Sequence, residues 1–213
     1  NWSSLKWAPL ALWTLGTQNF ALLGRSRMER ECATTSLLSR GGLPVPKILQ
    51  TDFEDRLILR EYVHGENIRD VVKSIIHRKK RQTGNLELIG RVGRAIAAVH
   101  RLGATLGDCK PENFIVSEGT PFIIDLEQGG KGGNVTWDLA EFLYFAGHYA
   151  APLDLLKGVA EITTSFIKGY ADAGGDKRKV SEAGRLKYTK VFTPFTLPQV
   201  IYTIAKTCRT ESK

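Results

Sequence analysis

The sequence is short of cysteine, and it lacks an apolar run long enough to cross a membrane. Its three cysteines, Cys32, Cys109 and Cys208, include no C-x-x-C pair, so neither a disulfide framework nor a structural zinc site is expected. Its most apolar stretch, Trp7 to Leu23, is broken by proline, glycine and polar residues and falls short of the ~18–20 residues of a transmembrane helix. We therefore expect no transmembrane segment, and a reducing, cytoplasmic setting.

Two further absences concern the start of the chain. No G-x-G-x-x-G loop and no V-A-I-K lysine occurs in the first part of the sequence, where Lys6 is the only lysine before Lys47. The first residue is Asn1 and not methionine, so we expect a truncated chain or a degenerate site. Three early tryptophans, Trp2, Trp7 and Trp13, suit packing against a partner or the rest of the fold better than a membrane interface.

What is present is an ordinary globular composition with a basic balance. The 213 residues are 42% hydrophobic and 24% charged, enough for one compact domain or two small lobes around a cleft. The net charge of +8 favours anionic partners, namely nucleotide phosphates, RNA or an acidic membrane surface. The basic run Arg78 to Arg81 is interpreted as a solvated face in preference to an RNA contact.

The order of the expected elements indicates an α+β fold with two lobes. Apolar spacing and capping residues predict helices, and β-branched runs between turn residues predict strands. The predicted helices are 26–39, 67–79, 86–102, 137–148, 153–173, 177–192 and 197–208, and the predicted strands are 47–51, 56–63, 114–116 and 121–124.

The most informative segment is a polar loop followed by a hairpin. Asp108 and Asn113 lie in the loop, and Asp125 follows the second strand of the hairpin. Because a tight hairpin brings the outer ends of its strands together, Asn113 and Asp125 are expected to lie close in space. Carboxylate and amide oxygens suit Mg²⁺, which takes few protein ligands and completes its shell with phosphate oxygens. Turn and cap roles in an ordinary hairpin are the less favoured alternative.

This segment resembles the catalytic loop and metal-binding strand of the protein-kinase superfamily. Residues Asp108 to Asn113 read D-C-K-P-E-N and match D-L-K-P-E-N at five of six positions, and Asp125 takes the place of the aspartate of D-F-G. The resemblance implies that Asp108 orients the acceptor hydroxyl, Lys110 neutralises the transferred phosphate, and Asn113 and Asp125 hold Mg²⁺ on ATP.

Two other segments extend the resemblance. Glu31 resembles the helix glutamate that orients the phosphate-binding lysine, and Glu61 and Val63 resemble the hinge whose backbone contacts adenine. The implied fold is a two-lobe kinase-like one, with a truncated or reduced N-terminal lobe over residues 1–63 and a mainly helical catalytic lobe over 64–213. The G-L-P-V-P loop, the E-Y-V-H-G hinge and the G-D loop are similar to the small kinases of the KEOPS-complex, RIO and aminoglycoside-phosphotransferase-like group.

The sequence also departs from the typical kinase pattern. Leu106-Gly107 stands where protein kinases have His-Arg, D-F-G becomes Asp125-Leu126-Glu127, and no A-P-E follows, which argues for an atypical kinase or an ATPase. Asp138 is interpreted as a structural helix N-cap in preference to a brace for the catalytic loop, which is the role that the resemblance implies. Cys109, His100 and His148 are expected to pack, and Glu127 to be exposed.

Three functions follow, in order of preference. The first is an ATP- and Mg²⁺-dependent phosphotransferase or ATPase whose acceptor is a hydroxyl of a protein or small molecule. The partner expected for it is a tRNA-modification complex or RNA. The second is a catalytically weak pseudokinase-like scaffold or RNA-associated binding module, which the missing front motifs and Leu106 favour. The third is a membrane-surface kinase acting on a lipid or sugar, which the early tryptophans suggest.

Overall fold

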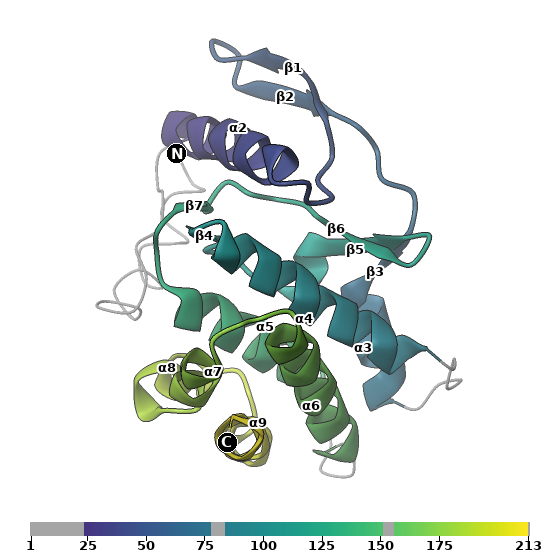
Figure 1. Ribbon diagram of the computed structural model, residues 1–213, viewed down its shortest axis with the longest axis vertical. Helices are drawn as coiled ribbons and strands as arrows, with labels where there is room; N and C mark the ends of the chain where they lie inside the picture. The colour runs from purple at the N-terminus through teal and green to yellow at the C-terminus, as the bar shows by residue number, and fades with distance from the viewer. Residues whose placement is uncertain (1–23, 78–83, 151–155, 213) are drawn as a thin grey trace.

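The molecule has a small upper part and a larger, mainly helical lower part (Figure 1). The computed structural model describes residues 24–77, 84–150 and 156–212. In the upper part, helix α2 (Gly24–Arg40) lies beside an antiparallel hairpin of β1 (Ile48–Asp52) and β2 (Leu57–Arg60). The predicted α+β class is therefore confirmed, with a reduced upper lobe. The boundary between residues 63 and 64 stays a prediction.

A three-stranded sheet lies between the two parts. Its order is β3 (Glu66–Asn67), β5 (Phe114–Ser117) and β6 (Thr120–Ile123), all antiparallel, with Phe114 opposite Ile123. The predicted hairpin is thus confirmed, and its turn uses positive φ angles at Glu118 and Gly119. A second, unpredicted pair, β4 (Ala104–Thr105) with β7 (Gly130–Lys131), flanks the loop that precedes β5.

The lower part is built from helices around one apolar core. Asn67 caps α3 (Ile68–Ile76), with its side-chain oxygen accepting the Arg69 N–H at 2.9 Å. The helices α4 (Asn85–Arg101), α5 (Val135–His148), α6 (Leu156–Asp172) and α9 (Pro198–Glu211) complete the bundle. The inner face of α4 is buried, since its residues Ile89, Val92, Ile96 and Val99 have no exposed surface.

Helices α4 and α6 approach each other unusually closely. A Cβ atom at Gly93 would lie 2.3 Å from the backbone oxygen of Phe166, and one at Gly169 would lie 2.0 Å from the backbone oxygen of Gly90. Real Cβ atoms do not tolerate such distances, so glycine sets the separation of the two helices. This contact fixes α4, whose C-terminal end leads into the catalytic loop.

Several predicted boundaries were wrong. The predicted helix 177–192 is two helices, α7 (Lys177–Ala183) and α8 (Leu186–Phe192). The break lies at Gly184, where a Cβ would meet the Ala205 carbonyl of α9 at 2.8 Å; the apolar pattern of one segment does not reveal this contact with another. The strand predicted to reach Val63 ends at Arg60, and the helix predicted to reach residue 79 ends at Ile76, with His77 as its C-cap.

Some predictions fall outside the described residues. These are the roles of Lys6, of the early tryptophans Trp2, Trp7 and Trp13 and of the basic run 78–81, and also the start of the helix predicted from residue 153. Among the residues that are described, no helix combines the length and the apolar character needed to cross a bilayer.

Candidate active site

The catalytic-loop segment is held from below by helix α5. Asp138 has no exposed surface, and its two carboxylate oxygens accept the N–H groups of Leu106 and Gly107 at 2.7 and 2.8 Å. Its Oδ2 atom also lies 3.1 Å from Nε2 of the packed His100. Asp138 is therefore a brace for the loop, and the N-cap interpretation was wrong because Asn134 caps α5.

A second acid of α5 supports the same loop. Glu141, 2% exposed, accepts the N–H of Cys109 at 2.7 Å, and the indole N–H of Trp137 donates to the Gly107 carbonyl at 3.1 Å. Burial, and the nearby carboxylate of Asp108, raise the pKa of Glu141 well above its ordinary value. The loop backbone is thus fixed by hydrogen bonds with Trp137, Asp138 and Glu141, which lie within about one turn of α5.

The proposed catalytic residues lie together at the top of this loop. The ammonium nitrogen of Lys110 lies 2.5 Å from Oδ1 of Asp108. The amide nitrogen of Asn113 donates to the Asp108 carbonyl at 2.8 Å and lies 3.5 Å from its Oδ2 atom. The structure therefore brings Asp108, Lys110 and Asn113 into one cluster, with Asn113 9% exposed.

The β5–β6 hairpin brings Asp125 to the same place. The Ile124 N–H donates to the Asn113 carbonyl at 2.9 Å, one step beyond the strand ladder. Asp125 then leaves the strand with φ at +58°, a left-handed conformation that aspartate tolerates better than most residues. Such geometry is often retained where a side chain must point to a functional site.

Acidic groups dominate the electrostatics around Asp125. Its pKa is raised, first by burial and then by the charges of Glu127 and Asp108, while Arg60 and Arg27 lower it. Carboxylates that raise one another's pKa form a region that a bound cation stabilises. The described residues contain no group of three His, Cys, Asp or Glu arranged around a metal, but one amide and one carboxylate fit Mg²⁺, which keeps phosphate and water ligands.

Helix α2 forms two ion pairs, one within the upper part and one with the segment that follows Asp125. Glu31 of α2, with a 7% exposed side chain, bonds Nη1 of Arg60 on β2 at 3.0 Å. Burial raises the pKa of Glu31, and Arg60 opposes that effect. Arg27 of α2 pairs with Glu127, so the prediction that Glu127 is exposed was wrong: its side chain is 25% exposed.

The hinge residues Glu61 and Val63 lie between β2 and β3, outside any regular strand. The Glu61 N–H donates to the Lys47 carbonyl at 2.8 Å, and its carboxylate accepts the Lys47 N–H at 3.2 Å. The chain is therefore anchored at Lys47 before it crosses to the lower part. The predicted adenine contact of Glu61 and Val63 stays a prediction.

Sequence reasoning missed Arg60, Arg27 and Glu141. In the sequence, Arg60 lies 29 residues from its partner, Arg27 lies 100 residues from its partner, and Glu141 lies 32 residues from its partner. A local residue pattern therefore cannot predict these contacts. For Glu141 a signal existed: it lies one turn after Asp138 on a helix that is otherwise apolar, where an acid needs a partner.

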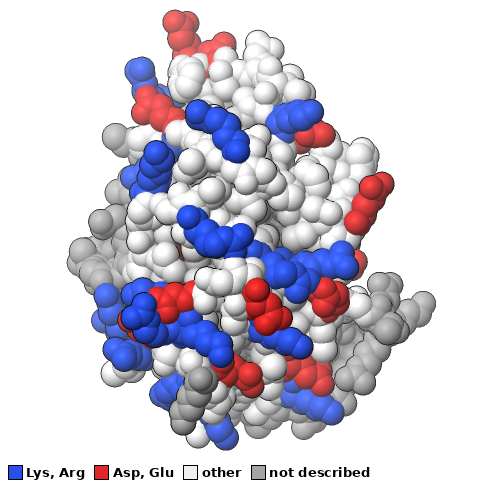
Figure 2. Space-filling view, in the orientation of Figure 1, with Lys and Arg blue, Asp and Glu red and all other residues white. Residues whose placement is uncertain are grey.

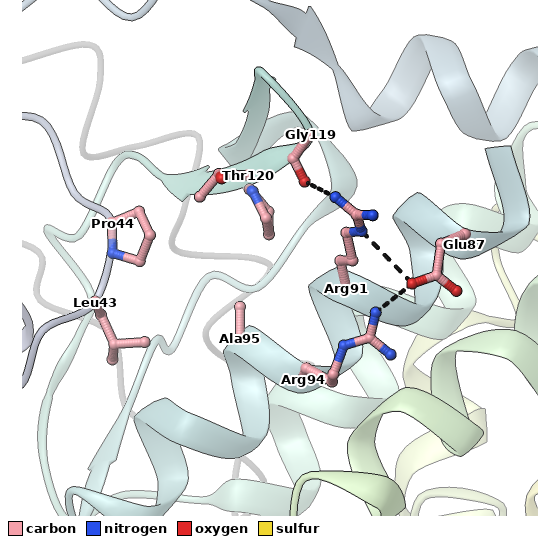
Figure 3. A pocket seen from close by; sticks show the side chains of 9 residues that line it. Leu43, Pro44, Glu87, Arg91, Arg94, Ala95, Gly119 and Thr120 are labelled. Atoms are coloured by element: carbon pink, nitrogen blue, oxygen red, sulfur yellow. Dashed lines mark hydrogen bonds and ion pairs between the residues drawn. The ribbon is translucent and has the colours of Figure 1, made fainter. Parts of the chain in front are cut away.

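A separate surface pocket of about 470 Å³ lies between α4 and the β5–β6 turn. Figure 3 shows Arg91 donating to the Gly119 carbonyl, and Glu87 pairing with both Arg91 and Arg94. None of the proposed catalytic residues lines it. Figure 2 shows basic side chains forming a band across the face on which α4 lies.

The fold and the site define an atypical protein-kinase-like phosphotransferase. Residues 16–138, more than half of the chain, match the lipopolysaccharide kinase (Kdo/WaaP) family. The chain belongs to this family.

Named relatives agree with that class. The chain is 26% identical over 164 residues to the KEOPS complex subunit Bud32 of Pyrococcus abyssi, covering 71% of this chain and 67% of the relative. It is 26% identical over 162 residues to a probable serine/threonine-protein kinase BUD32 homolog of Archaeoglobus fulgidus, covering 76% and 74%. The solved structure of WaaP in complex with acyl carrier protein has the same fold, with a TM-score of 0.55 at 14% identity, covering 77% of this chain and 75% of that one.

Proposed function

We propose that the chain transfers the terminal phosphate of Mg²⁺-bound ATP to a hydroxyl group or to water. The observation that carries the proposal is the cluster of Asp108, Asn113 and Asp125, gathered by the β5–β6 hairpin above a loop that α5 fixes. Asn113 and Asp125 would hold Mg²⁺, which supplies charge neutralisation on the phosphates, while Asp108 orients the hydroxyl. Phosphoryl transfer depends mainly on such positioning and electrostatics.

Lys110 adds a cation to this cluster. Its ion pair with Asp108 and the nearby Glu141 raise the pKa of the ammonium group, against the effect of burial. The lysine therefore stays charged at neutral pH and is suited to neutralise the phosphate as it moves. Glu31, Glu61 and Val63 complete the proposed ATP site.

The acceptor is the finer part of the proposal. Relatives named as Bud32 subunits of KEOPS and as bifunctional tRNA threonylcarbamoyladenosine biosynthesis proteins, together with the net charge of +8, support a role in a tRNA-modification complex in the cytoplasm. The family description names lipopolysaccharide, so a sugar hydroxyl is the second candidate, in line with the membrane-surface hypothesis.

Two aspartate variants test the function. Asp108→Asn should retain Mg²⁺·ATP binding and lower turnover by ~10²–10⁴-fold, because the group that orients the hydroxyl loses its charge. Asp125→Asn should lower turnover by about a hundredfold or more and shift the Mg²⁺ dependence to higher concentration. The measurement is phosphate release and transfer from labelled ATP against Mg²⁺ concentration.

Asp176→Asn is the matched control, because Asp176 caps α7 and forms its ion pair with Arg178 on the surface. Turnover by Asp125→Asn equal to that of the unaltered chain would remove the metal role. Absence of Mg²⁺·ATP binding by the unaltered chain, combined with salt-sensitive RNA binding, would favour the pseudokinase-like or RNA-associated module instead.

A further inference from the structure

The surface pocket beside α4 lies where the upper part of the molecule meets the lower part. Its walls come from the loop between α2 and β1, from α4, and from the β5–β6 turn with the start of β6. Its volume of about 470 Å³ is within the range of about 300–1,000 Å³ that is typical of ligand sites. None of the described residues that line it belongs to the proposed active site, so a role for this pocket is independent of the proposed function.

Hydrogen bonds within the chain hold the walls of the pocket together. The Ile123 N–H of β6 donates to the Pro44 carbonyl of the loop at 3.0 Å. Nη1 of Arg91 on α4 donates to the Gly119 carbonyl of the turn at 2.7 Å. The pocket is therefore preformed, and an occupant would not have to pay for ordering its walls.

The pocket has an apolar side and a charged side, which Figure 3 shows facing each other. Leu43 and Pro44 form the apolar side, and Arg91, Arg94 and Glu87 form the charged side. One carboxylate oxygen of Glu87 lies 3.5 Å from Nε of Arg91 and 2.5 Å from Nη2 of Arg94. Because two guanidiniums share one acid, the charged side keeps an excess of positive charge.

The two guanidiniums retain donors for a further acceptor. Each guanidinium carries five N–H groups in a planar fork that matches a carboxylate. Within the described residues, no acceptor is found for Nη2 of Arg91 or for Nη1 of Arg94. The two side chains are 43% and 40% exposed, so these donors are accessible to an occupant of the pocket.

We infer that this pocket docks an extended segment of a partner protein in which an acidic residue stands beside an aliphatic one. The aliphatic side chain packs against Leu43 and Pro44, and the carboxylate accepts hydrogen bonds from Arg91 and Arg94. Arginine is enriched where proteins meet, and its bonds contribute most where apolar contacts exclude water. The excess of positive charge selects an acidic segment.

Two other kinds of occupant fit the pocket less well. The charged side chains are 40–56% exposed, so a small molecule would stay largely in water, whereas small-molecule sites bury about 70–90% of the ligand surface. The bases of single-stranded RNA stack on aromatic side chains, and the described lining residues include none. A protein segment can continue over the rim and needs only the aliphatic wall.

The test recovers binders from peptides of random sequence. A phage library that displays each peptide in many copies, so that weak binding is retained, is selected on the unaltered chain. The recovered peptides should be enriched in acidic residues next to aliphatic ones. In fluorescence anisotropy, the most enriched peptide should bind Arg91→Gln combined with Arg94→Gln at least about 10-fold more weakly, the weight of one charge-assisted hydrogen bond.

A second variant obstructs the pocket and keeps both arginines. Ala95→Gln places a larger side chain on the α4 wall and should weaken peptide binding by about 10-fold. The matched control is Arg178→Gln combined with Arg185→Gln, because both arginines are exposed and neither lines the pocket. The control should leave the affinity unchanged, and thermal unfolding checks that each variant is folded.

Recovery of no peptide above background, or of peptides without acidic residues, would overturn the inference. Peptides that bind both pocket variants as tightly as the unaltered chain would also overturn it. An oligouridylate serves as the RNA probe. If no peptide is recovered and oligouridylate binding is lost in the double arginine variant, the two arginines bind RNA and the inference is wrong.

Discussion

At the scale of single residues, the acids around the site differ in the groups that stabilise their negative charge. Asp138 accepts two backbone N–H groups, Glu31 has an arginine, and Asp125 has only partial compensation, so its pKa is raised. The pKa values of Glu31 and Glu141 are raised as well. A cation bound at Asp125 would stabilise the folded state.

Glu141 gives a pH-dependent prediction at this scale. Burial raises the pKa of Glu141 in the folded state well above the ordinary value of a glutamate, so the folded protein holds a proton that the unfolded chain has released. The free energy of unfolding contributed by this group therefore falls as pH rises from about 4.5 towards the raised pKa.

Glu141→Gln keeps an acceptor for the Cys109 N–H and removes this titration. The variant should unfold at a higher urea concentration than the unaltered chain at pH 8. The difference should be smaller at pH 5, because there a larger share of the unfolded chains also carries the proton on Glu141. Glu141→Ala serves as the contrast, since it leaves the Cys109 N–H unpaired at a cost of ~1–3 kcal/mol at either pH. A Glu141→Gln variant less stable at pH 8 than at pH 5, relative to the unaltered chain, would contradict the assignment.

At the scale of elements, the position of the catalytic loop depends on two helices. Helix α5 holds the loop through Trp137, Asp138 and Glu141, and α4 leads into it from the opposite end. The separation of α4 from α6 is set by backbone contacts at Gly93 and Gly169. A change in the distance between α4 and α6 would therefore move the start of the catalytic loop.

Two glycine-to-alanine changes on α4 should have opposite effects. At Gly93 the new Cβ would meet the Phe166 backbone oxygen at 2.3 Å, whereas at Gly90 its nearest neighbour is the Ser165 oxygen at 3.5 Å. Gly93→Ala should therefore destabilise the protein by ~1–3 kcal/mol. Gly90→Ala should be neutral or stabilising by up to ~1 kcal/mol, because alanine favours the helix. Thermal unfolding measures both, and equal destabilisation would show that the separation is not set by these contacts.

The features that the sequence predicted correctly depend on residues close together in the chain. The hairpin, and hence the proximity of Asn113 and Asp125, followed from two short apolar strands joined by a turn. The break at Gly184 and the pairs Glu31–Arg60 and Arg27–Glu127 depend on contacts between distant segments. Those contacts exist only after the helices have packed, so neither periodicity nor spacing carries a signal for them.

At the scale of the whole molecule, the net charge of +8 bears on the choice of partner. Basic side chains form a band on the face shown in Figure 2. If the chain acts with tRNA, its affinity should fall steeply with salt, since each neutralised phosphate releases counterions.

The prediction is that the logarithm of the tRNA association constant falls linearly with the logarithm of salt concentration. A slope of about −3 or steeper would correspond to roughly four or more phosphate contacts at ~0.7–0.9 per contact. Filter binding or fluorescence anisotropy between 50 and 200 mM salt measures it, and Arg91→Gln combined with Arg94→Gln tests whether the arginines of α4 contribute. An affinity independent of salt would exclude an electrostatic tRNA interface.

The support that α5 gives to the loop acts on main-chain atoms. Asp138 and Glu141 bind the N–H groups of Leu106, Gly107 and Cys109, and a main-chain N–H is present whatever non-proline side chain follows it. The position of the loop backbone is therefore set independently of the side chains at Leu106 and Cys109. Leucine can stand at position 106, where protein kinases have histidine, without loss of these hydrogen bonds.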